Sequence, residues 1–372
     1  MRNNRHFLKN KLIFPVLAAL IGIFLSFLLA ELVLRAAGFT PIYINPLKSF
    51  HDPDPLTGWR GKRNFSARFA TPAFNTRIVH DERGFRKQEF PSPEPVPKQT
   101  IFVFGDSFTW GWGVDQGEVF TDQMSLSLAD SQIVNYGING MGTVGEYLLF
   151  QQECEPLLQA QDVVLVMFYL NDFLDNIQPN GARVYADWNH GEIEMIHPKT
   201  RAHAGRLKKI LSYSYLYNIL SYQLNTLKKQ LGEQREQIIF AQQVDLHDQH
   251  PAFQVTKHFL HEFKTACQNK QADFVLVYIP GQYELDEGEG NGDQKRQIEH
   301  SFHSAIQAIT DSLDIEMLDL LPYFLEVKHE QPEVRLTLYG DAHWNALGHQ
   351  YAARAIAAYL DNLRDHDIVT SE

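Results

Sequence analysis

The sequence of 372 residues predicts an α/β protein in which helices cover both faces of a parallel sheet of about five strands. Short apolar runs alternate with longer amphipathic stretches from residue 99 onward. Apolar runs of about four to seven residues are typical of strands buried on both faces, and such strands belong to parallel sheets. An uncharged stretch near the N-terminus additionally predicts one helix that spans a membrane.

The membrane helix is predicted over residues 12–30, which carry no charge. At about 1.5 Å per residue this stretch is about 28 Å long, close to the ~30 Å hydrocarbon core of a bilayer. Basic residues precede it and only Arg35 follows closely, so the positive-inside rule places the N-terminus in the cytoplasm and the rest outside. A cleaved signal peptide is the alternative, but its apolar stretch would be shorter. Residues 1–38 are therefore assigned to a cytoplasmic tip and an anchor, in which Glu31 and Arg35 can pair.

Residues 39–98 are rich in proline and show little periodicity, which is typical of irregular structure. Short strands are expected near Phe65–Phe69 and Thr76–Val79. We expect this segment to be an arm that packs on the following domain rather than a domain of its own.

Residues 99–372 carry the alternating pattern of strands and helices. The apolar runs predict the strands Ile101–Phe104, Gln132–Tyr136, Val163–Tyr169, Phe274–Ile279 and Glu316–Leu320. The amphipathic stretches predict the helices Glu118–Leu128, Glu146–Leu158, Val255–Gln268, Ile298–Leu313 and Ala346–Leu363. Strands that alternate with helices in this way predict the parallel sheet.

A helical insertion at about 177–255 separates the third and fourth strands. Leucines at helical spacing from Leu207 to Leu231, with lysines on the other side, predict an amphipathic helix. We expect this helix to pack on the sheet, and a lid or a contact with the membrane surface is the alternative. Cys154 and Cys267 show no metal-binding spacing and are expected to be buried free thiols.

The formal net charge is −12, and the basic residues concentrated near the N-terminus leave the remainder more acidic still. Such a surface repels phosphate backbones and argues against nucleic acid as a partner. His247 and His250 lack accompanying carboxylates, and the stretch Glu287–Ile298 lacks the final Glu of a calcium loop. We therefore expect no metal site at these residues. We interpret His349 as a surface or capping residue of the last helix.

The candidate chemistry begins at the end of the first strand, where the sequence reads Gly105-Asp106-Ser107. Sites of parallel sheets form at the carboxyl ends of the strands. A serine at such a turn exposes its hydroxyl, and its own N–H can point at a developing oxyanion. Serine is also a common helix N-cap, so this motif alone does not identify a nucleophile.

Two further elements follow the second and third strands. Gly137 and Gly140 lie in the first of them, and glycine lets the backbone approach a ligand closely. Asn171 lies in the second, where its side-chain amide can donate a hydrogen bond to an oxyanion. Taken alone, a flexible connection and a turn explain these elements equally well.

The fourth element is Asp341-Ala342-His343, after the last strand. Residues two apart in an extended segment project to the same side. His343 can then accept the Ser107 proton as general base, while Asp341 holds the imidazole and stabilises its protonated form.

The four elements occur in one order: Gly-Asp-Ser, then Gly, then Asn-Asp, then Asp with His, each just after a predicted strand. In this order the chain resembles the SGNH (GDSL-type) serine hydrolases over about Ile101–Tyr169 and Phe274–Leu363. The resemblance implies a flavodoxin-like three-layer α/β/α sandwich. It also implies ester or acyl-group chemistry without a metal or cofactor.

The resemblance assigns roles to individual residues. It makes Ser107 the nucleophile and completes the triad with Asp341 and His343. The oxyanion hole would consist of the N–H groups of Ser107 and Gly140 and the side chain of Asn171. Gly137 is the alternative for the glycine position.

The chain departs from the family in one respect. The usual spacing is Asp-x-x-His, whereas this sequence has Asp341-Ala-His343-Trp344. The shorter form is similar to proteins that O-acetylate bacterial exopolysaccharides such as alginate, although in those the pair precedes the serine. The resemblance implies an esterase that acts outside the membrane on an acylated carbohydrate or similar ester. An O-acyltransferase for an exopolysaccharide or cell-wall glycan, and a non-enzymatic scaffold of envelope assembly, are the alternatives.

Overall fold

The computed structural model describes residues 4–37, 50–71, 73–90, 97–179, 183–189, 191–197, 210–211, 213–221, 223–224, 227–228, 246–285 and 292–370. The chain divides into two compact units, one of Met1–Asn45 with His203–Glu236 and the other of Pro46–Ala202 with Gln237–Glu372. The second unit contains the sheet and every predicted site residue.

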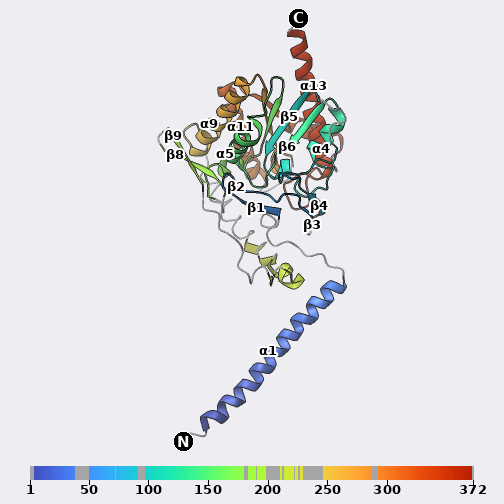
Figure 1. The fold of residues 1–372 in the computed structure, drawn as a ribbon, viewed down its shortest axis with the longest axis vertical. Coiled ribbons are helices and arrows are strands. Elements are labelled where there is room, and N and C mark those ends of the chain that lie inside the picture. The colour runs from blue at the N-terminus through green and yellow to red at the C-terminus, as the bar shows by residue number, and fades with distance from the viewer. Residues whose placement is uncertain are drawn as a thin grey trace. The chain divides into compact units, whose positions relative to one another are not determined.

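The sheet consists of five parallel strands in the order β11-β10-β7-β5-β6. Figure 1 labels two neighbouring strands of this sheet, β5 and β6. The strands are β5 (Gln99–Gly105), β6 (Ser131–Asn135), β7 (Val163–Phe168), β10 (Asp273–Tyr278) and β11 (Glu316–Asp319). Each corresponds to a strand predicted from the sequence, with ends that differ by at most two residues. Every residue of β7 is buried because this central strand is covered on both faces.

Two hydrophobic cores lie on opposite faces of the sheet, because successive side chains of a strand point to opposite sides. Phe104 belongs to the first core and its neighbour Val103 to the second. The first core is covered by α5 (Thr143–Leu149), α9 (Pro251–Asn269) and α11 (Gly292–Leu313). The second is covered by α4 (Phe120–Ser127), α12 (Leu321–Glu330) and α13 (Ala346–Thr370). The fold is therefore the expected three-layer α/β/α sandwich, and Cys154 and Cys267 lie in its first core as free thiols.

Within the described part of the chain, three antiparallel hairpins accompany the sheet. Those of the arm are β1 (His51–Asp54) with β2 (Gly58–Gly61), and β3 (Ser66–Ala70) with β4 (Asn75–Val79). The sequence predicts only the second of these. The insertion contains β8 (Tyr185–Asn189) with β9 (Glu192–Ile196), which the sequence does not predict. The predicted helix Glu146–Leu158 is α5 continued by a π-helical turn, η1 (Phe150–Cys154).

The arm contacts the loops at the carboxyl end of the sheet. Trp59 Nε1 donates a hydrogen bond of 3.0 Å to the Asn139 carbonyl, in the loop after β6. The buried guanidinium of Arg86 donates to the carbonyls of Gly111 and Val114, in the segment after the first strand of the sheet. The arm therefore supports the two loops in which glycine and serine motifs were predicted.

The first unit contains α1 (Asn4–Ala36), whose segment Phe14–Ala36 is long and apolar enough to cross a membrane, with a mean hydropathy of 2.6. Glu31 and Arg35 form the expected ion pair at 2.7 Å. The Glu31 carboxylate also accepts hydrogen bonds from the N–H groups of Tyr215 and Leu216, which begin a helical stretch. The predicted amphipathic helix lies only partly within the described residues, and it groups with α1 rather than with the unit of the sheet.

His349 is not the surface or capping residue of the last helix that the sequence suggested. It lies on α13 and is 1% exposed. Its ring stacks on Phe120, and its Nδ1 accepts a hydrogen bond from the Phe120 N–H at the start of α4. Burial lowers the pKa of His349 to about 3, so the imidazole is neutral and available as this acceptor.

Candidate active site

Ser107 is the first residue of α3 (Ser107–Trp110), the short helix that follows β5. Asp106 caps this helix, because its Oδ1 accepts a hydrogen bond of 2.8 Å from the Phe108 N–H. The turn requires glycine at position 105, where φ is +154° and a Cβ would lie 2.1 Å from Thr109 Oγ1. Ser107 is thereby held, half-buried, at the carboxyl end of a central strand.

Ser107, His343 and Asp341 form a continuous hydrogen-bonded chain. Ser107 Oγ lies 2.7 Å from His343 Nε2, and His343 Nδ1 lies 2.5 Å from Asp341 Oδ1. The same carboxylate oxygen accepts a bond of 3.0 Å from the His343 N–H, which fixes the carboxylate relative to the ring. Because Nδ1 donates to Asp341, Nε2 can accept the proton of the Ser107 hydroxyl.

Asp341 is ionised in this arrangement. Burial alone would raise the pKa of Asp341, but the hydrogen bonds from His343 and Trp112 lower it to about 2. The Trp112 Nε1 donates to Asp341 Oδ2 at 3.3 Å. The rings of Phe108 and Trp112 lie against the His343 ring, with centroid distances of 4.8 and 5.6 Å. A charged carboxylate therefore faces an imidazole whose position aromatic packing restrains.

Asn171 precedes the short helix α6 (Asp172–Asp175) after β7. Its Nδ2 donates to Asp175 Oδ2 at 2.8 Å and lies 3.5 Å from Asp106 Oδ2. That oxygen of Asp106 is also 3.4 Å from Ser107 Oγ. The amide of Asn171 and the hydroxyl of Ser107 thus share one carboxylate as a neighbour, and the fold brings the two predicted residues together.

The two candidate glycines differ in what their N–H groups do. Gly140 has a φ of +66°, which favours glycine, and no described residue accepts a hydrogen bond from its N–H. The Gly137 N–H donates to Asn135 Oδ1 at 2.8 Å, and a Cβ at Gly137 would lie 2.4 Å from Trp110 N. Gly137 is therefore required for close packing on α3, while Gly140 retains an N–H for a ligand.

A buried arginine connects Gly140 with Asn171. The Arg183 guanidinium donates to the Gly140 carbonyl at 3.1 Å and pairs with Asp175 Oδ1 at 2.7 Å. The other Asp175 oxygen holds Asn171. Neither Arg183 nor Asp175 was predicted from the sequence. Asp175 lies four residues after Asn171, a helical spacing that could have revealed it, whereas no pattern marks Arg183.

Three buried carboxyl groups adjoin the site. Burial raises the pKa of Asp106 to about 6, although the nearby His343 acts in the opposite direction. Burial and the neighbouring Asp106 raise the pKa of Glu146 well above its ordinary value. Burial and Glu146 do the same for Asp172. The site consequently carries less negative charge than its number of carboxyl groups suggests.

Of the residues weighed as metal ligands from the sequence, only the two histidines can be assessed among the described residues. His247 and His250 belong to no group of potential ligands among the described residues. The first five residues of the acidic stretch Glu287–Ile298, 287–291, lie outside the described residues. A group that the sequence did not suggest does gather, because the donor atoms of Glu284, His300 and His303 lie within 4.8 Å of one another.

Comparisons with known proteins give the following matches. A model of the GDSL-like Lipase/Acylhydrolase family matches residues 103–351. A solved member of the lipolytic protein G-D-S-L family from Veillonella parvula is 13% identical, with a TM-score of 0.39 over 69% of this chain and 95% of its own. The acetylxylan esterase Axe2 from Geobacillus stearothermophilus is 12% identical, with a TM-score of 0.39 over 70% of this chain and 93% of its own. A search of the curated proteins found no significant match.

Proposed function

Because the chain belongs to the GDSL-like lipase/acylhydrolase family, we propose that it is a serine esterase that removes acyl groups from an acylated carbohydrate or a similar small ester. One observation carries this proposal: Ser107 Oγ, the His343 ring and the Asp341 carboxylate follow one another at hydrogen-bond distances of 2.7 and 2.5 Å. An acyl-enzyme mechanism requires a hydroxyl, a base and an orienting carboxylate in this spatial order.

In the first half of the reaction, Ser107 Oγ attacks the ester carbonyl while His343 Nε2 takes the hydroxyl proton. The ionised Asp341 stabilises the imidazolium that results. The tetrahedral intermediate then collapses, the bond to the alcohol breaks, and His343 returns the proton to the departing oxygen. The products of this half are the free alcohol and an acyl ester of Ser107.

The negative charge of the intermediate develops on the former carbonyl oxygen. We assign three donors to it: the N–H groups of Ser107 and Gly140, and Nδ2 of Asn171. The N–H of Gly140, from which no described residue accepts a hydrogen bond, supports this choice over Gly137, whose N–H is already bonded to Asn135. One hydrogen of the Asn171 amide is directed to Asp175 at 2.8 Å, and the second makes only a long bond of 3.5 Å to Asp106 Oδ2, which an oxyanion could replace. Asn171→Ala is expected to lower the rate on the order of 10²–10³-fold.

In the second half, water attacks the acyl ester and His343 again takes the proton, which releases the acid and regenerates Ser107. Transfer to a sugar hydroxyl would use the same steps with the sugar in place of water. Analysis of the products with and without a glycan acceptor distinguishes the two outcomes.

We further propose that Phe14–Ala36 anchors the enzyme in a membrane with its N-terminus in the cytoplasm and the sheet-containing unit outside. The length and hydropathy of the segment support a span, and the basic residues before it support the orientation. Resistance to alkaline extraction and release by detergent test the anchor. A protease added to intact cells with a permeable outer layer should digest the sheet-containing unit. This tests on which side of the membrane that unit lies.

The nucleophile is tested with the full chain in detergent and an aryl acetate as substrate. Ser107→Ala is expected to abolish turnover, and a fluorophosphonate is expected to label the wild type at Ser107 and leave the variant unlabelled. Ser301→Ala, an exposed serine on α11, is the matched control and should behave as wild type. Undiminished turnover by pure Ser107→Ala protein would refute the assignment.

A further inference from the structure

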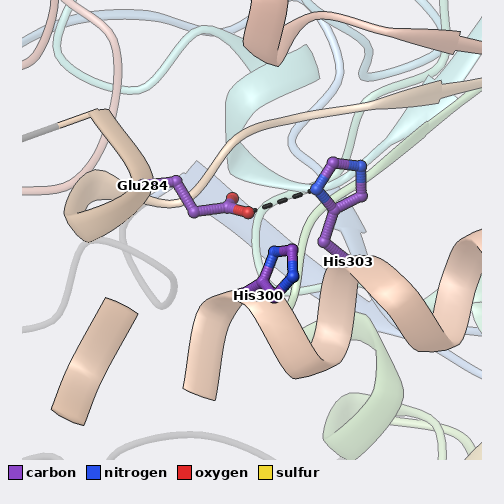
Figure 2. A group of neighbouring side chains, drawn as sticks. All are labelled: Glu284, His300 and His303. Carbon is purple, nitrogen blue, oxygen red and sulfur yellow. Dashed lines mark ion pairs between the residues drawn. The ribbon is translucent and has the colours of Figure 1, made fainter. Parts of the chain in front are cut away.

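Glu284, His300 and His303 form a cluster of metal-ligand side chains apart from the triad. Among the described residues, theirs is the one group of three or more His, Cys, Asp or Glu side chains whose donor atoms all lie within 4.8 Å. Glu284 belongs to α10 (Gln282–Leu285), which follows β10. Figure 2 shows Glu284 extending towards α11, from which both histidines project on the side that faces it.

The Glu284 carboxylate is fixed by one of its two oxygens. Oε2 accepts hydrogen bonds of 2.6 Å from the Tyr278 hydroxyl and 2.9 Å from the Gly281 N–H. The side chain is only 3% exposed, and its second oxygen, Oε1, makes no hydrogen bond of acceptable geometry among the described residues but faces the ring of His303 at 3.2 Å. A buried carboxylate oxygen of this kind requires a cation or a donor nearby.

His303 presents one ring nitrogen to that oxygen. Its Nδ1 lies 3.2 Å from Glu284 Oε1, and its Nε2 lies 3.2 Å from Asp319 Oδ2 at the end of β11. The ring is also stacked on Tyr278, with a centroid distance of 4.1 Å. Metal-binding histidines commonly donate their other ring N–H to a carboxylate, which is the role that Asp319 can fill.

The spacing of these two donors suits a tetrahedral ion. Two ligand atoms about 2.0–2.2 Å from a tetrahedral zinc ion lie roughly 3.3 Å apart. The distance from His303 Nδ1 to Glu284 Oε1 is 3.2 Å. His300 lies one helical turn before His303 on α11 and is exposed, so its side chain can rotate to close the third position without disturbing the core.

We propose that Glu284 Oε1, His303 Nδ1 and a ring nitrogen of His300 bind a divalent first-row transition metal, with Zn²⁺ as the best match to two imidazoles and a carboxylate. The fourth position would be taken by water, because His300 is at the surface. This proposal is independent of the esterase function, and it reverses the expectation from the sequence that no metal site is present.

The bound ion would connect α10 to α11 at the carboxyl end of β10. Glu299 adds a further buried carboxylate there, because its Oε2 accepts hydrogen bonds from the N–H groups of Tyr283 and Glu284. A proton competes with the metal for His303. Burial opposes a charge on this ring, but the carboxylates of Asp319 and Glu284 prevail and raise the pKa of His303 to about 9. Binding of the metal must therefore displace that proton.

The test uses the untagged full chain in detergent, stripped of metal with a chelator, at a single pH near neutrality. Zn²⁺ titrated against a chromophoric competitor is expected to bind with a stoichiometry of one and to raise the melting temperature. Co²⁺ is expected to give the visible absorption of a tetrahedral site. Asp319→Asn removes only the outer carboxylate and should weaken the binding by about 10–100-fold. His300→Gln removes a ligand and should weaken it more.

The matched control is the double variant His258→Gln/His261→Gln. These histidines are also three residues apart and exposed on a helix, α9, but they belong to no group of potential ligands among the described residues. The control should bind Zn²⁺ as wild type does. The proposal is wrong if wild type binds no more tightly than His300→Gln, a surface change that leaves the fold intact. His303 would then serve only as a protonated partner of its two carboxylates.

Discussion

At the scale of single residues, the candidate oxyanion hole depends on a buried charge outside the triad. Arg183 has a side-chain exposure of 2%, and it bonds both the Gly140 carbonyl and Asp175. A planar guanidinium can hold two acceptors in fixed directions, whereas an ammonium acts as a single compact charge. Arg183 is therefore a positioning residue for Gly140 and Asn171, since it touches neither the nucleophile nor the reacting carbonyl.

Arg183→Lys is expected to lower kcat for an aryl acetate by about tenfold and to leave KM nearly unchanged, because the lost hydrogen bonds matter mainly when the oxyanion forms. Arg183→Met should also lower the free energy of unfolding, by about 3–5 kcal/mol, because it leaves Asp175 without its partner. Steady-state kinetics and urea unfolding measure the two effects separately.

The control for this pair is Arg60→Lys. Arg60 is likewise largely buried and pairs with a carboxylate, Glu153, at 2.7 Å, but it bonds neither Gly140 nor Asn171. It should lose some stability and keep kcat. An equal fall in kcat for Arg60→Lys and Arg183→Lys would show that the loss reflects general loosening of the unit rather than the oxyanion hole.

The sequence predicts the candidate triad residues and not the residues that support them, for a physical reason. Ser107 and His343 lie in short local motifs at strand ends, where the type of residue is set by chemistry. Arg183 acts through Gly140, which is remote in sequence, and through Asp175, from which irregular chain separates it. Its role can therefore be recognised only from the folded structure. Asp175 is intermediate, because its helical spacing from Asn171 is local.

At the scale of elements, Gly137 and Gly140, two of the three glycines in the loop between β6 and α5, serve different purposes. Gly137→Ala is expected to lower the free energy of unfolding by about 2–3 kcal/mol, because its Cβ would lie 2.4 Å from the backbone nitrogen of Trp110. Gly140→Ala should lower it by only about 1–2 kcal/mol. Its Cβ has room, with Trp59 at 3.7 Å, and the loss comes from the positive φ alone.

Urea unfolding of the two variants side by side tests this difference, and circular dichroism verifies that both retain the fold. Because Gly140→Ala keeps its N–H, it should also retain most of the esterase activity. Equal stabilities of the two alanine variants would contradict the close approach of the loop to α3.

The parallel sheet could be predicted because strands covered on both faces are apolar throughout, as β7 is. The hairpins β1–β2 and β8–β9 could not be predicted in the same way. β1 reads His-Asp-Pro-Asp and β9 reads Glu-Ile-Glu-Met-Ile, so polar residues dominate the first and only one side of the second is apolar. Such short segments become strands through pairing with a neighbour rather than through burial.

At the scale of the whole molecule, part of the acidic charge lies inside the fold. Burial raises the pKa of Asp106 to about 6 and that of Glu299 to about 7, and that of Glu146 lies well above its ordinary value. In the unfolded chain these groups lose their protons near pH 4, whereas the folded protein keeps them to higher pH. Unfolding therefore releases protons, and the protein must lose stability as the pH rises through this window.

Glu146→Gln tests this relation, because Glu146 is 1% exposed and neither of its carboxylate oxygens has a hydrogen-bond partner among the described residues. The amide mimics the protonated acid and cannot ionise. Below about pH 4.5 the variant should match wild type. Above it, wild type should lose about 1.4 kcal/mol per pH unit more than the variant until the folded carboxyl ionises. Urea unfolding from pH 4 to 8 measures the free energy of unfolding at each pH. Glu326→Gln, at an exposed position on α12, serves as the control. If the free energies of wild type and Glu146→Gln changed in parallel with pH, Glu146 would be ionised in the fold.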